Sequence, residues 1–147
     1  VLGWHSVVNP MDFGNYKFQL HDDAKRFEPG TQNIPGIVAM GASIDVLLEV
    51  GIEQVWENVQ KLTQQLCDGL PNVGCKVLSP RGKGQTSGSV VFTPTDENVN
   101  TKRVVAELSK QNIFAVVREG RIRVSPHFYN QPQQIDRLLE QLGKLCQ

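Results

Sequence analysis

Apolar residues recur at three- and four-residue steps through two consecutive segments, which predicts two helices. In residues 35–50 the repeating positions are Ile37, Met40, Ile44, Leu47 and Leu48. Neighbouring valines and alanines widen this apolar face, so we expect a largely buried helix that begins near Pro35 and ends at Gly51. Residues 52–70 carry a narrower apolar stripe opposite Glu, Gln and Lys, which is typical of an amphipathic helix at the surface.

Beyond the Gly and Pro of residues 68–72 the pattern changes to short strands that alternate with helices. In chain order we expect strands at 75–80 and 87–94, a helix at 100–112, strands at 113–119 and 121–126, and a final helix at 131–147. Asn100 is a plausible N-cap for its helix, and Gly120 marks a hairpin turn. This order predicts an α+β fold, a small and mainly antiparallel sheet with helices on one face.

Residues 1–33 lack any sustained period of 2 or 3.6, although they contain many aromatic side chains. The aromatic residues are Trp4, Phe13, Tyr16, Phe18 and Phe27. So many large apolar groups argue against disorder, and we expect an extended segment that lies over another surface. The predicted organisation is therefore an extended segment at 1–33 followed by a small domain at 34–147.

The charge balance argues against partners that recognise a strong field. Fifteen Lys and Arg residues match fifteen Asp and Glu residues, so no net charge steers the chain to nucleic acid or to a membrane. No apolar run approaches the length of a membrane span, and no leader pattern is visible. Three cysteines at unrelated spacings, Cys67, Cys75 and Cys146, fit neither a disulfide framework nor a zinc site. We therefore expect a cytoplasmic protein with reduced thiols.

Three further features favour structural roles. The glycine-rich segment 80–88 places Lys83 before Gly84 and leads into a strand, whereas a phosphate loop needs Gly-Lys-Ser/Thr at the start of a helix. The three histidines are far apart and have no carboxylate at ligand spacing, which argues against a metal site. No cysteine has a neighbouring histidine, so burial is the expected role of each.

The turn at residues 28–31 is a candidate anion contact. Glu28-Pro29-Gly30-Thr31 exposes backbone N–H groups and a hydroxyl just before a predicted helix, where the helix dipole favours negative charge. The alternative is a capping turn, in which Thr31 or Asn33 satisfies the first free N–H groups of the helix.

Three arginines occur within six residues, in "REGRIR". The period of two places Arg121 and Arg123 on one face of their strand and Ile122 on the other, which must face the helices. Arg118 belongs to the preceding strand. An arginine fork binds a carboxylate through two hydrogen bonds, which lysine cannot reproduce. The alternative is a solvated sheet face.

Two of these regions resemble a known family. The segments "RFEPGTQNIPGIVAMGASIDVLLEVGIEQV" and "REGRIRVSPHFYNQPQQIDRLLEQL" are similar to signature regions of the class V aminotransferases, which are fold-type I pyridoxal-phosphate enzymes. That family includes cysteine desulfurases, kynureninase and isopenicillin N epimerase-like proteins. The similarity runs from about Trp4 to the end of the chain.

The resemblance implies a role for particular residues. Gly30 and Thr31 match the Gly-Thr turn that contacts the cofactor phosphate of the partner subunit in a homodimer. Arg123 matches the arginine that binds the α-carboxylate of the amino-acid substrate, and Arg118 matches a second arginine near that pocket. Arg121 has no family role.

The resemblance also implies what this chain lacks. The family's Schiff-base lysine would lie upstream of Val1, so no catalytic residue is assigned here. We therefore expect the C-terminal portion of a pyridoxal-phosphate-dependent enzyme, inactive by itself. Cysteine desulfurases carry a nucleophilic cysteine in a loop between the two arginine strands, whereas Glu119 and Gly120 alone join them here. This difference argues against that mechanism and resembles the epimerase-like branch.

A second hypothesis remains at this stage, from a different class of protein. The chain would be a stand-alone, non-catalytic α+β binding module that uses its arginine face for a carboxylate or a protein ligand. A nucleic-acid-binding sheet is disfavoured by the zero net charge and by the lack of aromatic residues on the predicted strands.

Overall fold

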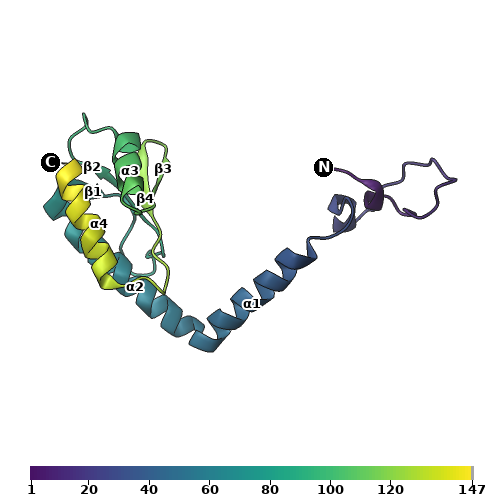
Figure 1. Cartoon of the computed structure of the whole chain (residues 1–147), viewed down its shortest axis with the longest axis horizontal. Coiled ribbons are helices and arrows are strands. Elements are labelled where there is room, and N and C mark those ends of the chain that lie inside the picture. The colour runs from purple at the N-terminus through teal and green to yellow at the C-terminus, as the bar shows by residue number, and fades with distance from the viewer. Residues whose placement is uncertain (147) are drawn as a thin grey trace. The chain divides into compact units, whose positions relative to one another are not determined.

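The computed structural model describes residues 1–146 (Figure 1). The chain divides into two compact units, Val1–Val46 and Leu47–Gln147, and each is described by itself.

Backbone hydrogen bonds hold the N-terminal part of the first unit together. Two short 3-10 helices, η1 (Trp4–Ser6) and η2 (Ala24–Phe27), flank an isolated bridge between Val7 and Leu20. The amide of His21 donates to the carbonyl of Ser6 at 3.1 Å, and Ser6 is fully buried. The aromatic residues of this segment are exposed, namely Trp4, Phe13, Tyr16, Phe18 and Phe27. Residues 1–33 therefore fold without an apolar core.

Helix α1 (Ile34–Val50) lies where the sequence predicts it but is not buried. Asn33 begins the helix through a hydrogen bond from the Gly36 amide to its Oδ1 at 3.1 Å, and Gly51 follows the last residue with φ of 86°. None of its residues is buried, and Leu48 is 73% exposed. The prediction of a largely buried helix is therefore wrong for this chain. An apolar periodicity shows that a face needs a partner, but it does not show that the same chain provides one.

The second unit contains the sheet and three helices. Its elements are α2 (Ile52–Gly69), η3 (Leu70–Val73), β1 (Cys75–Val77), β2 (Val90–Pro94), α3 (Thr101–Lys110), β3 (Val116–Arg118), β4 (Arg121–Val124) and α4 (Pro132–Leu145). The strands form one antiparallel sheet in the order β1-β2-β4-β3. The α+β prediction is confirmed, with strands shorter than predicted. Asn100 caps α3 by accepting from the amides of Lys102 and Arg103.

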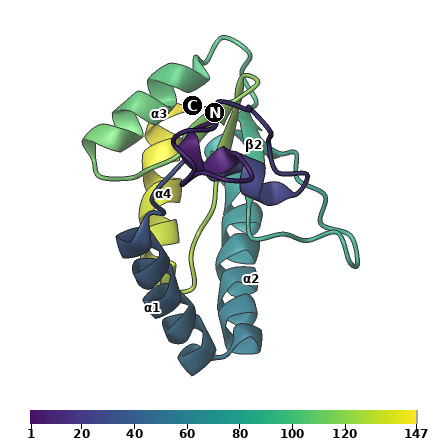
Figure 2. The ribbon, with the colours of Figure 1, turned by 90° about the vertical axis from the view of Figure 1, so that its right-hand side faces the viewer.

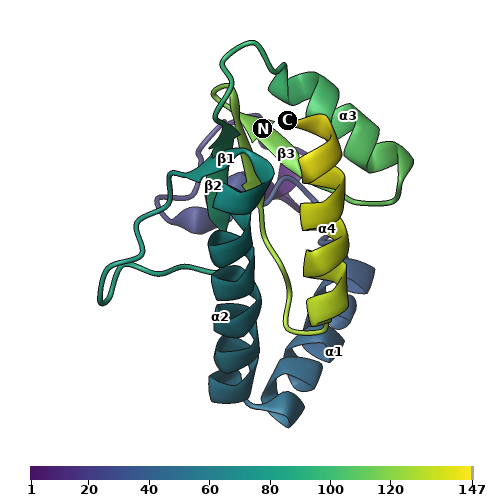
Figure 3. The same ribbon diagram turned by 90° about the vertical axis from the view of Figure 1, so that its left-hand side faces the viewer.

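The helices cover one face of this sheet and form the core with it. Figure 3 shows α2 and α4 side by side in front of the strands, and Figure 2 gives the opposite view. Leu66 of α2, Phe92 of β2, Ile122 of β4 and Leu142 of α4 are all fully buried in one cluster. Gly69 allows α4 to come close, since a Cβ at this position would lie 2.3 Å from the Leu139 side chain.

The turn between β3 and β4 has only two residues. Arg118 pairs with Arg121 across it, and both Glu119 and Gly120 have positive φ, at 50° and 76°. Positive φ at both central positions is the pattern of a type I′ turn, whose twist matches that of the flanking strands. The hairpin predicted at Gly120 is confirmed.

This geometry predicts opposite effects for two substitutions in the turn. Gly120→Ala should destabilise the second unit by about 1–2 kcal/mol, because a Cβ is unfavourable in the left-handed region. Glu119→Asn should instead be neutral or stabilise by a few tenths of a kcal/mol, since it gives the favoured Asn-Gly pair. Urea unfolding followed by circular dichroism measures both. Equal effects of the two variants would contradict the turn assignment.

No single helix in residues 1–146 is both long and apolar enough to span a membrane. The two consecutive segments Ile34–Val50 and Ile52–Val73 reach the required length and apolar content only when they are taken together, and the chain bends sharply between them.

Candidate functional site

The antiparallel register places the three arginines on one face of the sheet. Arg121 and Arg118 are directly opposite each other on β4 and β3, and Arg123 lies two residues further along β4. Residues that pair directly across an antiparallel ladder project to the same side. Ile122, between the two β4 arginines, is fully buried in the core. The predicted alternation is confirmed, so the arginine face is the one that the helices leave uncovered.

Arg123 is the most enclosed of the three arginines. It is half-buried, whereas Arg118 and Arg121 are exposed. The register gives it a valine on each side, Val91 of β2 and Val116 of β3. Its Nε atom is buried and has no hydrogen-bond partner among the described residues. A buried donor without a partner remains available to an anion, and charge interactions strengthen where water is displaced.

None of the three arginines forms an ion pair within residues 1–146. All three ion pairs found in residues 1–146 are local helix pairs, Lys61–Glu57, Lys110–Glu107 and Lys144–Glu140. Like charges directly opposite each other on neighbouring strands are destabilising, as at Arg118 and Arg121. This arrangement favours an external anion as the missing counter-charge.

Sequence reasoning missed the two valines beside Arg123. Their positions follow from strand pairing between residues that are far apart in the chain, and no local periodicity reports such pairing. The same pairing brings Ser89 beside Ser125, whose hydroxyls are 2.8 Å apart. The arginine face of the sheet therefore carries positive charges, apolar side chains and hydroxyl groups.

The Gly30–Thr31 turn belongs to the first unit. Gly3 lies so close to Pro29 that an added Cβ would be 2.1 Å from the Pro29 carbonyl oxygen, which fixes the backbone that enters the turn. Asn33, and not Thr31, caps α1. Within residues 1–146, no hydrogen bond uses the Thr31 hydroxyl or the amides of Gly30 and Thr31. The turn thus presents free donors next to a helix N-terminus. The capping role considered for Thr31 or Asn33 belongs to Asn33.

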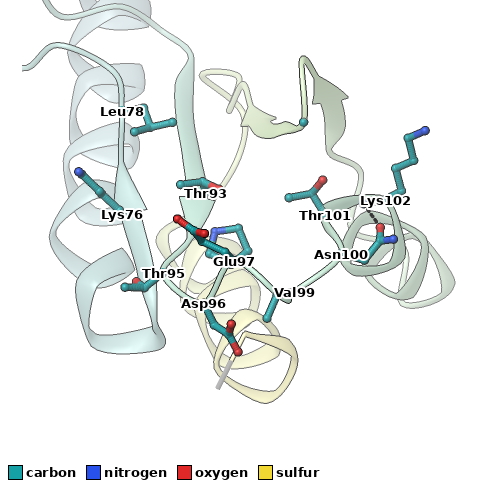
Figure 4. A pocket seen from close by; sticks show the side chains of 12 residues that line it. Lys76, Leu78, Thr93, Thr95, Asp96, Glu97, Val99, Asn100, Thr101 and Lys102 are labelled. Carbon is teal, nitrogen blue, oxygen red and sulfur yellow. Dashed lines mark hydrogen bonds between the residues drawn. The ribbon is translucent and has the colours of Figure 1, made fainter.

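A groove of about 800 Å³ lies at one end of the sheet (Figure 4). Its lining has both charge signs, from Lys76 and Lys102 and from the carboxylates of Asp96 and Glu97. Gly120 is part of the lining, but Arg118 and Arg123 are not. Because its charges are mixed and it excludes the enclosed arginine, we do not assign the substrate to this groove.

The other candidate groups have structural surroundings. No cluster of three or more His, Cys, Asp or Glu residues able to hold a metal occurs in the described part of the chain. All three cysteines are buried, and burial raises the pKa of the Cys67 thiol, which disfavours a nucleophilic thiolate there. Residues 78–89, which contain the glycine-rich segment, form a connection between β1 and β2 without a helix.

The family is decided by comparison with known proteins. The model of the family described as aminotransferase class-V matches residues 6–138, most of the chain. The chain belongs to the class V aminotransferase family. Curated family relatives include a "probable cysteine desulfurase" of Pyrococcus abyssi at 24% identity and one of Methanothermobacter thermautotrophicus at 27%. An "uncharacterized aminotransferase YcbU" of Bacillus subtilis is 24% identical.

These relatives are much longer than this chain. The Pyrococcus match covers 87% of this chain and 35% of the relative, and the Methanothermobacter match covers 99% and 39%. The chain therefore spans less than half the length of the curated relatives that it matches.

Solved structures with the same fold belong to enzymes of similar names. A complex of the cystine C-S lyase C-DES with cysteine persulfide aligns at a TM-score of 0.77 and 22% identity, over 99% of this chain and 38% of that one. The apo cysteine desulfurase from Thermococcus onnurineus aligns at 0.78 and 21%, with the same coverage. At this identity the likeness establishes the fold of the class V chain.

Arg118 and Arg123 thus share one sheet face, and Gly30 and Thr31 share one turn. The two pairs belong to different units.

Proposed function

We propose that this chain supplies the substrate-carboxylate arginine and a cofactor-phosphate contact of a pyridoxal-phosphate-dependent class V enzyme that acts on an amino acid. The observation that carries the proposal is the environment of Arg123. A half-buried guanidinium between Val91 and Val116, with a buried Nε and no partner, suits a carboxylate that arrives from outside. Arg118, more exposed on the same face, provides a second positive charge near this position.

The Gly30–Thr31 turn fits a phosphate group. Its two amides and the Thr31 hydroxyl are free to donate, and Lys25 and Arg26 of η2 lie a few residues before it. One of the related solved structures is described as having glycine covalently linked to its pyridoxal-phosphate cofactor. In a homodimer, which we propose for the complete enzyme, this turn would contact the cofactor of the other subunit.

The cofactor supplies electron withdrawal that labilises a bond at the substrate Cα, and the protein supplies orientation and charge. Arg123 binds the α-carboxylate through two parallel hydrogen bonds and so fixes the direction of the Cα substituents. Val91 and Val116 flank Arg123 on the two neighbouring strands. Thr31 anchors the phosphate, so the cofactor and the substrate are held at separate points.

We also propose how the remainder of the chain contributes. The exposed aromatic side chains of residues 1–33 would pack on another part of the complete enzyme. The resemblance places the cofactor-binding lysine outside this chain, which spans 35–39% of its matched relatives in the first two comparisons. The chain by itself should therefore not turn over amino acids.

The hairpin supports a reaction without a cysteine nucleophile between the arginine strands. Only Glu119 and Gly120 connect β3 to β4, and their type I′ geometry leaves no loop that could carry a mobile thiol. We therefore propose transamination, epimerisation or elimination for the complete enzyme, although several relatives are named cysteine desulfurases.

The test uses the complete enzyme reconstituted with pyridoxal 5′-phosphate. The bound cofactor should change its visible absorbance when an L-amino acid is added, and should not respond to the matching amine that lacks the carboxylate. With cysteine as substrate, persulfide on the enzyme should not accumulate. A response of equal size to amine and amino acid would rule out the carboxylate role of Arg123.

Thr31→Val should weaken cofactor binding about 10- to 100-fold, because the variant loses one hydrogen bond to a charged phosphate. Equilibrium dialysis of the complete enzyme against pyridoxal 5′-phosphate measures this affinity. Thr95→Val is the matched control, since Thr95 is an exposed threonine outside the turn. Equal affinity of the two variants would show that Thr31 does not contact the phosphate.

A further inference from the structure

Cys75 and Cys146 both lie in the core of the second unit, on elements that pack against the same short helix. Cys75 begins β1 and is 2% exposed, and Cys146 follows the last residue of α4 and is 3% exposed. Both belong to the same buried cluster, and α4 and β1 both pack against η3. They are 71 positions apart in the chain, so only the fold brings them together.

The backbone near both cysteines explains this arrangement. Gly143, one turn before Cys146, packs against Val73, whose Cγ1 would lie in ordinary van der Waals contact, at 3.5 Å, with a Cβ at position 143. Gly74, between Val73 and Cys75, has φ of 72° and turns the chain from η3 into β1. The end of α4 therefore packs against η3, which directly precedes the segment that carries Cys75. Figure 3 shows the C-terminal end of the chain and β1 at the same end of this unit.

We propose that Cys75 and Cys146 form a reversible disulfide that joins the start of β1 to the end of α4. A disulfide requires two sulfur atoms on neighbouring backbone segments that come together without distortion, and the packing of Gly143 on Val73 provides this proximity. Cys67 of α2 is the third thiol and remains reduced.

The oxidant is a low-molecular-weight disulfide such as oxidised glutathione. The Cys146 thiolate attacks one of its sulfur atoms, which forms a mixed disulfide and releases one equivalent of thiol. The Cys75 thiolate then attacks the Cys146 sulfur and expels the second equivalent. Two electrons pass from the cysteine pair to the oxidant, and the two cysteine protons end on the two released thiols.

The surroundings of the pair determine the order of these steps. Interaction with Cys75 lowers the pKa of Cys146, while interaction with Cys146 and burial raise the pKa of Cys75 above its usual range. Cys146 therefore ionises first and is the attacking group. It lies at a helix end, where the last turn opens more readily than the core. Oxidation should accordingly be slow, and its rate should rise with pH as the thiolate of Cys146 forms.

The experiment incubates the 147-residue chain with oxidised glutathione, then alkylates the remaining thiols and maps the peptides by mass spectrometry. The expected result is loss of two of three thiols and a single linkage, Cys75–Cys146. Cys67→Ser should form the same linkage, whereas Cys75→Ser and Cys146→Ser should form no intramolecular disulfide. Dithiothreitol should restore all three thiols.

Thermal unfolding gives an independent measurement. Oxidation should raise the Tm of the Cys67→Ser chain by roughly 10 °C, because the bond closes a long loop in the unfolded state. The same treatment in concentrated urea should give a mixture of pairings, since the fold selects the pair. The proposal is overturned if the folded chain keeps three free thiols, or if Cys67 enters the linkage, while the unfolded chain oxidises.

Discussion

Replacing Arg123 by lysine should lower kcat/KM of the complete enzyme for amino-acid substrates about 30- to 1,000-fold, which corresponds to the loss of roughly 2–4 kcal/mol. Lysine keeps the positive charge but cannot form two parallel hydrogen bonds to a carboxylate. Steady-state kinetics with a series of amino acids measures the effect.

Arg121→Lys is the matched control for this substitution. Arg121 lies on the same strand and the same sheet face as Arg123 and carries the same charge, but it is exposed beside the hairpin turn. We expect kcat/KM to change less than about threefold, because an exposed charge interacts weakly through water. If the two variants lost activity equally, the enclosure of Arg123 would have no bearing on substrate binding. Circular dichroism of both variants separates loss of activity from loss of fold.

The second large effect concerns stability. Phe92→Ala should destabilise the second unit by about 3–5 kcal/mol, since it removes a fully buried ring from the centre of the sheet. A domain of this size has a total stability of about 5–15 kcal/mol, so the variant should be close to unfolding at room temperature. Urea unfolding monitored by circular dichroism gives the difference directly.

Phe114→Ala serves as the control for Phe92→Ala. Phe114 precedes β3 in the same unit and is 79% exposed, so its removal should change stability by less than about 0.5 kcal/mol. A control variant as unstable as Phe92→Ala would show that the exposed ring is packed in solution. It would then contradict the core assigned to this unit.

Much of the fold could be predicted from local pattern. The two helices at residues 34–69 begin and end within a residue or two of the expected positions, because Asn33, Pro35 and Gly51 act on the backbone nearby. The hairpin at Gly120 was predictable for the same reason. Burial of α1 was not, since apolar periodicity describes a need for contact, and the contact itself depends on what surrounds the helix.

The sequence by itself determined the element order, the α+β class and the placement of Arg121 and Arg123 opposite Ile122. These follow from the period of two in a strand and from the chemistry of turn residues. The tertiary structure alone decided that Arg123 lies between Val91 and Val116, that Asn33 leaves Thr31 free, and that Cys75 and Cys146 lie in one buried cluster. Each of these contacts depends on strand register or helix packing, because these determine which distant residues become neighbours in the folded chain.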